Sequence, residues 1–232
     1  MEYTLTTLSR VEHSPAALEL APALADSALA LSSHRLLAAA LEIHEPEHDS
    51  FLYVVAGAGL LTVGGERADL EVGSGGLVLA GERAAVESGS GELVLLQATI
   101  GPDSDRHAPL GARELVVGAE SASASQAIGA RSFRVLFGPH NGSTRATLFV
   151  GYLPPGRAPW HYHLYDEIVW VPEGPGRVHR RSSDEPIDAG AAFRLRPREV
   201  HIVENSSADR EMAVLGIFTP AGSPAAAYLA EQ

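Results

Sequence analysis

The chain has 232 residues and a formal net charge of −12, from 29 acidic and 17 basic side chains. Cysteine and lysine are both absent, which excludes disulfides, thiolate metal sites, a catalytic thiol, a Walker-type phosphate loop and Schiff-base chemistry. The acidic balance argues against nucleic-acid or anionic-membrane partners, and no segment resembles a signal peptide or a transmembrane helix. We therefore expect a cytoplasmic protein whose partner is a small molecule.

Taken in chain order, the alanine-rich segment Ala16–Ala30 is compatible with a short helix, and short apolar runs separated by Gly and Pro follow it. Residues 101–127 are small and polar, as in a linker, although Glu114–Val117 can form one edge strand. Many short strands at this spacing predict an all-β sandwich or barrel. The predicted strands are Arg35–Ile43, Phe51–Ala56, Gly59–Val63, Gly76–Ala80, Glu92–Ile100, Ser132–Phe137, Arg145–Leu153, Glu167–Pro172, Arg177–Arg181, Ala191–Leu195, Val200–Glu204 and Met212–Thr219.

The two halves of the chain are related by an internal repeat. A shift of 117 residues places Gly57 on Gly174, Gly73 on Gly190 and His44 on His161, without a gap. A constant offset over this length indicates two copies of one β fold. We therefore expect two domains, residues 1–103 and 128–232, joined by a linker at 104–127.

Candidate metal ligands are found in the second copy. His161 and His163 alternate along a predicted strand, so both imidazoles point to the same face. Glu167 follows four residues later, and His201 lies in another strand that can be its neighbour. Three imidazoles and one carboxylate suit one divalent transition metal per chain, either Mn, Fe, Co, Ni or Zn. On an octahedral ion, four protein ligands leave two positions for water, dioxygen or a chelating substrate.

These residues carry a family resemblance. The pattern Gly156…His161-x-His163-x3-Glu167-x6-Gly174, followed by Gly190…Pro197…His201, resembles the paired motifs of the cupin superfamily. The gap between Gly156 and His161 is one residue shorter than usual, and Arg196 and Arg198 occupy positions where proline or glycine is common. The resemblance implies two tandem antiparallel β-barrels of the double-stranded β-helix or jelly-roll type, with the metal inside a barrel.

The first copy lacks the same ligands. His44, Pro46, Ser50 and Ala84 occupy the positions equivalent to the quartet, so three of the four ligand types are missing there. We expect the first barrel to serve packing or dimerisation and the metal to lie in the second barrel only. Because exposed sheet edges must be covered, we also expect a homodimer.

Further residues are assigned to the pocket by alternation. Val169 and Val171 share the face of Glu167 and are expected to line the pocket with it, whereas Trp170 points away. Arg194 is a candidate for binding a substrate carboxylate, and Glu167 is a candidate general base in addition to its role as ligand.

The resemblance leaves the reaction open, because one fold hosts many chemistries. We favour a metal-dependent, dioxygenase-like oxidoreductase acting on a small oxygen-rich molecule, since the ligand set is similar to that of cupin dioxygenases of the quercetinase type. The alternatives are an aldose–ketose isomerase acting on a sugar or uronate, and a non-enzymatic cupin that binds a small ligand or a metal. The identities of the substrate and of the metal are not determined by the sequence.

Overall fold

A computed structural model describes residues 6–7, 18–19, 26–104 and 107–230. Among these described residues the regular structure is all β apart from one short 3-10 turn, η2 (Pro139–Asn141), which confirms the predicted fold class. The strands up to residue 118 are β1 (Thr6–Thr7), β2 (Leu18–Glu19), β3 (Leu29–Leu37), β4 (Ala40–Ile43), β5 (Asp49–Ala56), β6 (Gly59–Val63), β7 (Glu66–Leu70), β8 (Ser74–Val78), β9 (Ala84–Ser88), β10 (Glu92–Ile100) and β11 (Val116–Gly118). The remaining strands are β12 (Ala124–Gln126), β13 (Ser132–Phe137), β14 (Thr147–Leu153), β15 (Gly156–Arg157), β16 (His161–His163), β17 (Asp166–Trp170), β18 (Gly176–Arg180), β19 (Asp184–Ile187), β20 (Ala191–Leu195), β21 (His201–Asn205), β22 (Met212–Thr219) and β23 (Ala227–Leu229).

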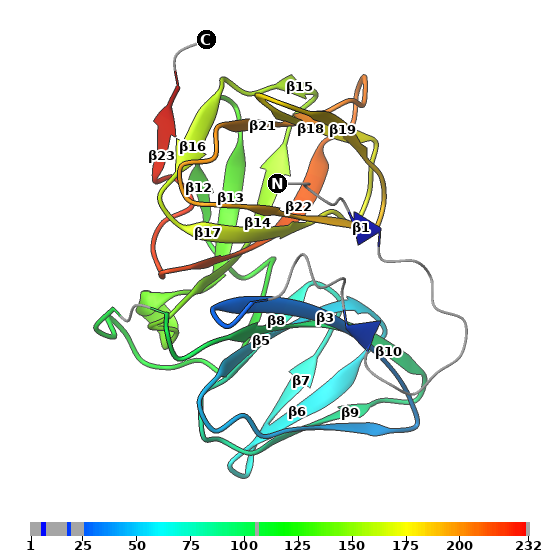
Figure 1. Cartoon of the computed structure of the whole chain (residues 1–232). Helices are drawn as coiled ribbons and strands as arrows, with labels where there is room; N and C mark the ends of the chain where they lie inside the picture. Colours follow the sequence, from blue (N-terminus) through cyan, green and yellow to red (C-terminus); the bar gives the residue numbers. More distant parts are fainter. Residues whose placement is uncertain (1–5, 8–17, 20–25, 105–106, 231–232) are drawn as a thin grey trace.

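The strands form two flattened barrels, each made of two antiparallel sheets packed face to face (Figure 1). In the first barrel, the sheet β11-β8-β5-β10-β3-β2 covers the sheet β4-β9-β6-β7. In the second barrel, the sheet β1-β20-β17-β22-β14-β13-β12 covers the sheet β19-β18-β21-β16-β23, with β15 also pairing with β21. Each barrel encloses an apolar core, which includes Leu61 and Leu95 in the first and Val178 and Phe193 in the second.

The internal repeat is visible in the strand boundaries. Moved by 117 residues, β6, β8 and β9 of the first barrel coincide end for end with β18, β20 and β21 of the second. The repeat inferred from a few glycines is thus a repeat of strand positions, and equivalent residues of the two barrels can be compared directly.

The two larger sheets pack against each other between the barrels. One apolar cluster combines Phe51 and Leu96 of the first barrel with Leu148, Trp170 and Ile217 of the second. Both faces of these sheets are therefore buried, which explains why β10 and β22 are almost continuously apolar in sequence. The barrels are joined by a hydrophobic core as well as by the chain.

Several sequence predictions are corrected by the structure. The run Arg35–Ile43 is two strands, because the chain turns at Ala38, whose φ is 49°. In the segment predicted as a helix, Leu18–Glu19 and the residues from Leu29 onward are strands, and positions 16–17 and 20–25 lie outside the described residues. The segment 104–127, which we propose as the linker, contributes β11 to the first barrel and β12 to the second.

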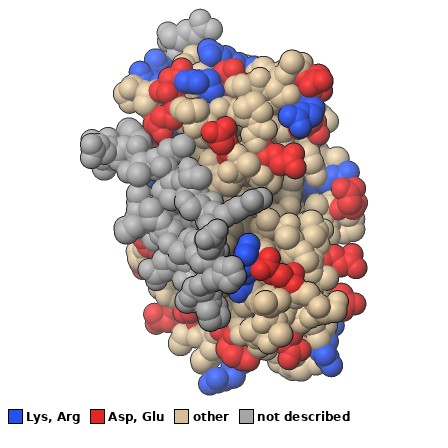
Figure 2. All heavy atoms as spheres, turned by 90° about the vertical axis from the view of Figure 1, so that its right-hand side faces the viewer, with Lys and Arg blue, Asp and Glu red and all other residues tan. Residues whose placement is uncertain are grey.

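Acidic and basic side chains are interspersed on the face of the molecule shown in Figure 2. Within the described residues, no helix has the length and apolar character needed to cross a membrane.

Candidate metal centre

The three predicted histidines lie together in the second barrel. β16 carries His161 and His163 on one face, and the backbone of His161 is directly opposite that of His201 on β21. One ring nitrogen from each histidine lies within 4.8 Å of the other two, and all three side chains are buried. Strand alternation and strand pairing thus bring residues that are forty positions apart into one cluster.

Two of the histidines are oriented by the backbone. Nδ1 of His161 lies 2.9 Å from the carbonyl oxygen of Pro159, and Nδ1 of His201 lies 2.8 Å from that of Glu199. Because a carbonyl oxygen only accepts, each Nδ1 must carry the proton, which leaves the Nε2 lone pair free. Histidines that bind metals are commonly held in this way, by a hydrogen bond from the nitrogen that does not coordinate.

Glu167 reaches the cluster from the opposite sheet. It lies on β17, and its Oε2 is 3.5 Å from Nε2 of His163. The carboxylate is buried, but its oxygens are not among the ligand atoms that lie within 4.8 Å of one another, which come from the three histidines alone in the described residues. The four predicted ligands therefore converge on the barrel interior, three from one sheet and one from the other.

Burial controls the protonation of these groups. It lowers the pKa of His163 to about 3, helped by the charge of His161, and it also lowers the pKa values of His161 and His201. Burial raises the pKa of Glu167 to about 8, an effect that the charge of Asp166 increases and the charge of Arg131 opposes. The three imidazoles are thus neutral at pH 7, the form in which histidine binds metal.

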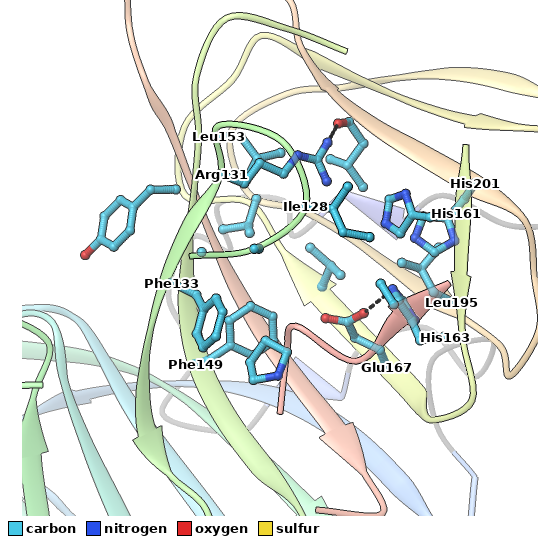
Figure 3. A pocket seen from close by; sticks show the side chains of 18 of the residues that line it. Ile128, Arg131, Phe133, Phe149, Leu153, His161, His163, Glu167, Leu195 and His201 are labelled. Carbon is cyan, nitrogen blue, oxygen red and sulfur yellow. Dashed lines mark hydrogen bonds and ion pairs between the residues drawn. The ribbon is translucent and has the colours of Figure 1, made fainter. Parts of the chain in front are cut away.

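A small cavity of about 100 Å³ adjoins the cluster (Figure 3). Its polar lining includes the four predicted ligands, and much of its remaining wall is apolar. The ring of Tyr165 stacks on His163 at 4.3 Å and on Phe218 at 3.9 Å, which fixes the orientation of the imidazole. The apolar wall includes Phe133, Phe149, Leu153, Val169, Leu195, Val203 and Val214.

The other residues predicted for the pocket have different locations. Val169 lines the cavity, whereas Val171 is buried in the core of the second barrel and does not reach it. Arg194 points out of the barrel, because Leu195 is the neighbour whose side chain faces the cavity. Its guanidinium pairs at 2.8 Å with both carboxylate oxygens of Asp166. Arg194 therefore does not reach the cavity in which it was predicted to bind a substrate carboxylate.

Sequence reasoning missed Arg131, a basic residue that lines the cavity. It follows β12 and immediately precedes β13, and it enters the pocket because this hairpin folds over the barrel interior. Its sequence context, Gly129-Ala130-Arg131-Ser132, contains no motif that points to a site. Arg131 could have been placed in the pocket only with knowledge of the hairpin that β12 and β13 form after the predicted linker.

The first barrel has no comparable cluster at the equivalent positions. Ser50, which corresponds to Glu167, accepts a hydrogen bond of 3.0 Å from Gln97 in the barrel interior. His44, which corresponds to His161, is exposed, and its ring approaches the carbonyl oxygen of Glu82. In the described part of the chain, no second group of three or more metal-binding side chains is found.

The donor set fits a divalent transition metal. Neutral imidazoles and a carboxylate suit borderline ions, and the proton on Nδ1 of His161 and His201 directs the other nitrogen into the cluster. Nδ1 of His163 is buried and has no hydrogen-bond partner among the described residues.

Comparisons with known proteins agree with the fold described above. Residues 148–218 match the Cupin_2 family, described as a cupin domain. No curated protein matches the chain. A variant of Bacillus subtilis oxalate decarboxylase has a similar fold, with a TM-score of 0.77 at 13% identity over 99% of this chain and 80% of that one. Another study of that enzyme concerns its Mn(II) centers.

Two further structures are similar over most of their own length. AerE from Microcystis aeruginosa has a TM-score of 0.67 at 16% identity, covering 83% of this chain and 87% of that one. A Cupin 2 conserved barrel domain protein from Leptotrichia buccalis has a TM-score of 0.66 at 14% identity, covering 95% and 98%. At these identities the likeness concerns the fold.

Proposed function

Because this chain belongs to the cupin superfamily, we propose that it is a metal-dependent enzyme whose single metal site lies in the second barrel. The observation that carries the proposal is the cluster of His161, His163 and His201, with two Nδ1–H groups held by backbone carbonyls. The Mn(II) centers of Bacillus subtilis oxalate decarboxylase, a protein of similar fold, support a divalent ion.

In this proposal the three histidines and Glu167 hold the ion. The ion would act as a Lewis acid toward oxygen atoms of a bound molecule and, if redox-active, would make dioxygen chemistry accessible. Glu167 lies to one side of the histidine cluster and belongs to the opposite sheet, and burial raises its pKa to about 8. In its deprotonated form it would be the group best placed to accept a proton from the substrate. Tyr165 and Phe218 keep His163 in place and exclude water from its side of the cavity.

The walls of the cavity favour a dioxygenase-like oxidoreductase over a sugar isomerase. A sugar or uronate carries a hydroxyl group on nearly every carbon, and each buried hydroxyl needs a hydrogen-bond partner. The cavity offers mainly aliphatic and aromatic side chains beyond the ligands, and its volume of about 100 Å³ suits only a few heavy atoms. We therefore propose a substrate of a few heavy atoms whose oxygen atoms are gathered at the end that meets the predicted ligands.

The reaction class is tested by oxygen uptake. Protein loaded with Fe(II) or Mn(II) is assayed with small hydroxy acids, oxo acids and diketones, beside the His201→Ala variant and the control His44→Ala. The proposal expects oxygen consumption with at least one compound, lost in His201→Ala and kept in His44→Ala. Exchange of a sugar C–H with solvent deuterium, without oxygen uptake, would instead identify an isomerase. Bound metal without any turnover would identify a binding protein.

A further inference from the structure

Arg131 lines the same cavity as the histidine cluster and is held in place by two hydrogen bonds. The hairpin that carries it is closed by a hydrogen bond of 2.9 Å from the backbone N–H of Ala127 to the carbonyl oxygen of Arg131. One guanidinium nitrogen donates to the carbonyl oxygen of Val203, two residues after His201 on β21. Figure 3 shows the Arg131 side chain extending into the pocket from the wall opposite the histidines. Strand β21, which carries the predicted metal ligand His201, thus also fixes the position of the Arg131 guanidinium.

The charge of Arg131 has no carboxylate partner within ion-pair distance among the described residues. The more deeply buried arginines of the same barrel are all paired, Arg145 with Asp49, Arg180 with Glu199 and Arg194 with Asp166. Burial lowers the pKa of Arg131 to about 10, and the charge of Glu167 across the same cavity opposes this effect, so the guanidinium is charged at neutral pH. A half-buried charge that makes no direct ion pair is costly, and a bound anion would reduce that cost.

The donors of Arg131 suit a carboxylate. A guanidinium has five N–H donors in a planar fork that matches the two oxygens of a carboxylate. Among the described residues, the guanidinium of Arg131 makes one hydrogen bond, to the carbonyl oxygen of Val203. The cavity volume of about 100 Å³ lies well below the roughly 300–1,000 Å³ of sites for drug-sized ligands, which limits the ligand to a few heavy atoms.

We propose that Arg131 binds the carboxylate of the substrate, and that the substrate is a small carboxylic acid with a second oxygen donor next to the carboxylate. The carboxylate contacts Arg131, and the second oxygen faces the three histidines across the cavity. In this proposal Arg131, and not Arg194 as predicted from the sequence, binds the substrate carboxylate. The inference rests on the proposed function, since the anion is the substrate of that metal site.

The test is calorimetric titration of Zn(II)-loaded protein with glycolate, with its uncharged analogue glycolamide and with inorganic phosphate. Zinc is redox-inert and prevents turnover, and its content is measured before each titration. The variant Arg131→Gln should bind glycolate about 10- to 100-fold more weakly, because a charge-assisted bidentate contact is lost. Its affinity for glycolamide should change much less, because an uncharged amide makes no charge-assisted bidentate contact. The exposed Arg157, which is paired with Glu204, provides the control Arg157→Gln, which should bind glycolate as the wild type does.

Unchanged glycolate binding by Arg131→Gln, an equal loss of glycolamide binding, or phosphate binding as tight as that of glycolate would overturn the inference. Absence of zinc from the wild type would contradict the proposed function instead, and titration of the metal-free protein would then still decide whether Arg131 binds the carboxylate. Phenylglyoxal labelling of the wild type, mapped by mass spectrometry, needs no folded variant. Glycolate should protect Arg131 from the reagent and glycolamide should not, and equal labelling in both would count against the inference.

Discussion

Gly216 on β22 lies directly beneath the candidate site, and its replacement by alanine should be costly. A Cβ atom at this position would lie 2.1 Å from Cε1 of Phe149, 2.3 Å from its Cζ and 2.8 Å from Oε1 of Glu167. The ring of Phe149 cannot move freely, because it packs edge-on against Phe133 and Phe218 at centroid distances of 6.3 and 5.9 Å. The added methyl group must therefore displace both the aromatic ring and the carboxylate.

Overpacking of this kind costs about 1–3 kcal/mol. We expect Gly216→Ala to lower the free energy of unfolding by about that amount, which corresponds to a fall in Tm of about 2–12 °C for a chain of this size. Metal affinity should fall as well, because Glu167 is displaced. Urea denaturation monitored by circular dichroism measures the first effect, and equilibrium dialysis against zinc measures the second.

Two further variants make this experiment decisive. Gly91→Ala places a methyl group in open space and should change stability by less than about 0.5 kcal/mol. Adding Phe149→Leu to Gly216→Ala should recover part of the lost stability by making room for the methyl group. If Gly216→Ala alone unfolds at the same urea concentration as the wild type, the packing described around Glu167 is wrong.

Three other predictions concern the rest of the fold. Arg198 has a φ of 65° in a turn where the first barrel has Gly81. Arg198→Gly should raise the free energy of unfolding by about 0.5 kcal/mol, and Gly81→Arg should lower it. Urea midpoints that move the other way would contradict this. Burial alone raises the pKa of Asp26, but hydrogen bonds from two arginines of the second barrel lower it to about 2. The stabilisation of the fold by the Asp26 carboxylate is therefore complete above pH 3.8 and is lost as the pH falls toward 2. The free energy of unfolding of Asp26→Asn should be lower than that of the wild type at pH 7 but not near pH 2. A difference between the two proteins that does not depend on pH would refute the pairing. Leu148→Ala, in the core between the barrels, should cost about 2–5 kcal/mol in thermal unfolding, whereas the exposed Leu110→Ala should cost almost nothing.

The sequence predicted the features that depend on local periodicity. Several strands, including Gly59–Val63, Glu92–Ile100 and Ala191–Leu195, coincide with the observed ones because apolar runs end at glycine or proline. The alternation of His161 and His163 placed both imidazoles on one face, as the structure shows. His201 was assigned to the same site because its predicted strand can lie beside that of the other two histidines, and because its spacing resembles the cupin motifs.

Features that depend on tertiary contacts were not predictable in the same way. Arg194 and Arg131 are both arginines of the second barrel, and only the pairing of β17 with β20 shows that the first points outward. Arg131 reaches the pocket through a hairpin that begins in the linker segment, where composition carries no structural signal. The turn at Ala38 was missed because apolar residues continue on both sides of it.

The most direct test of the metal proposal is the amount of metal bound per chain. Protein purified without a metal-affinity step, loaded with a divalent ion and dialysed, is analysed by inductively coupled plasma mass spectrometry beside the variants His161→Ala/His163→Ala and His44→Ala. We predict one ion per chain in the wild type and in His44→Ala, and none in the double variant, which should remain folded by circular dichroism. Full metal content in the double variant, or loss of metal from His44→Ala, would contradict the location of the site in the second barrel.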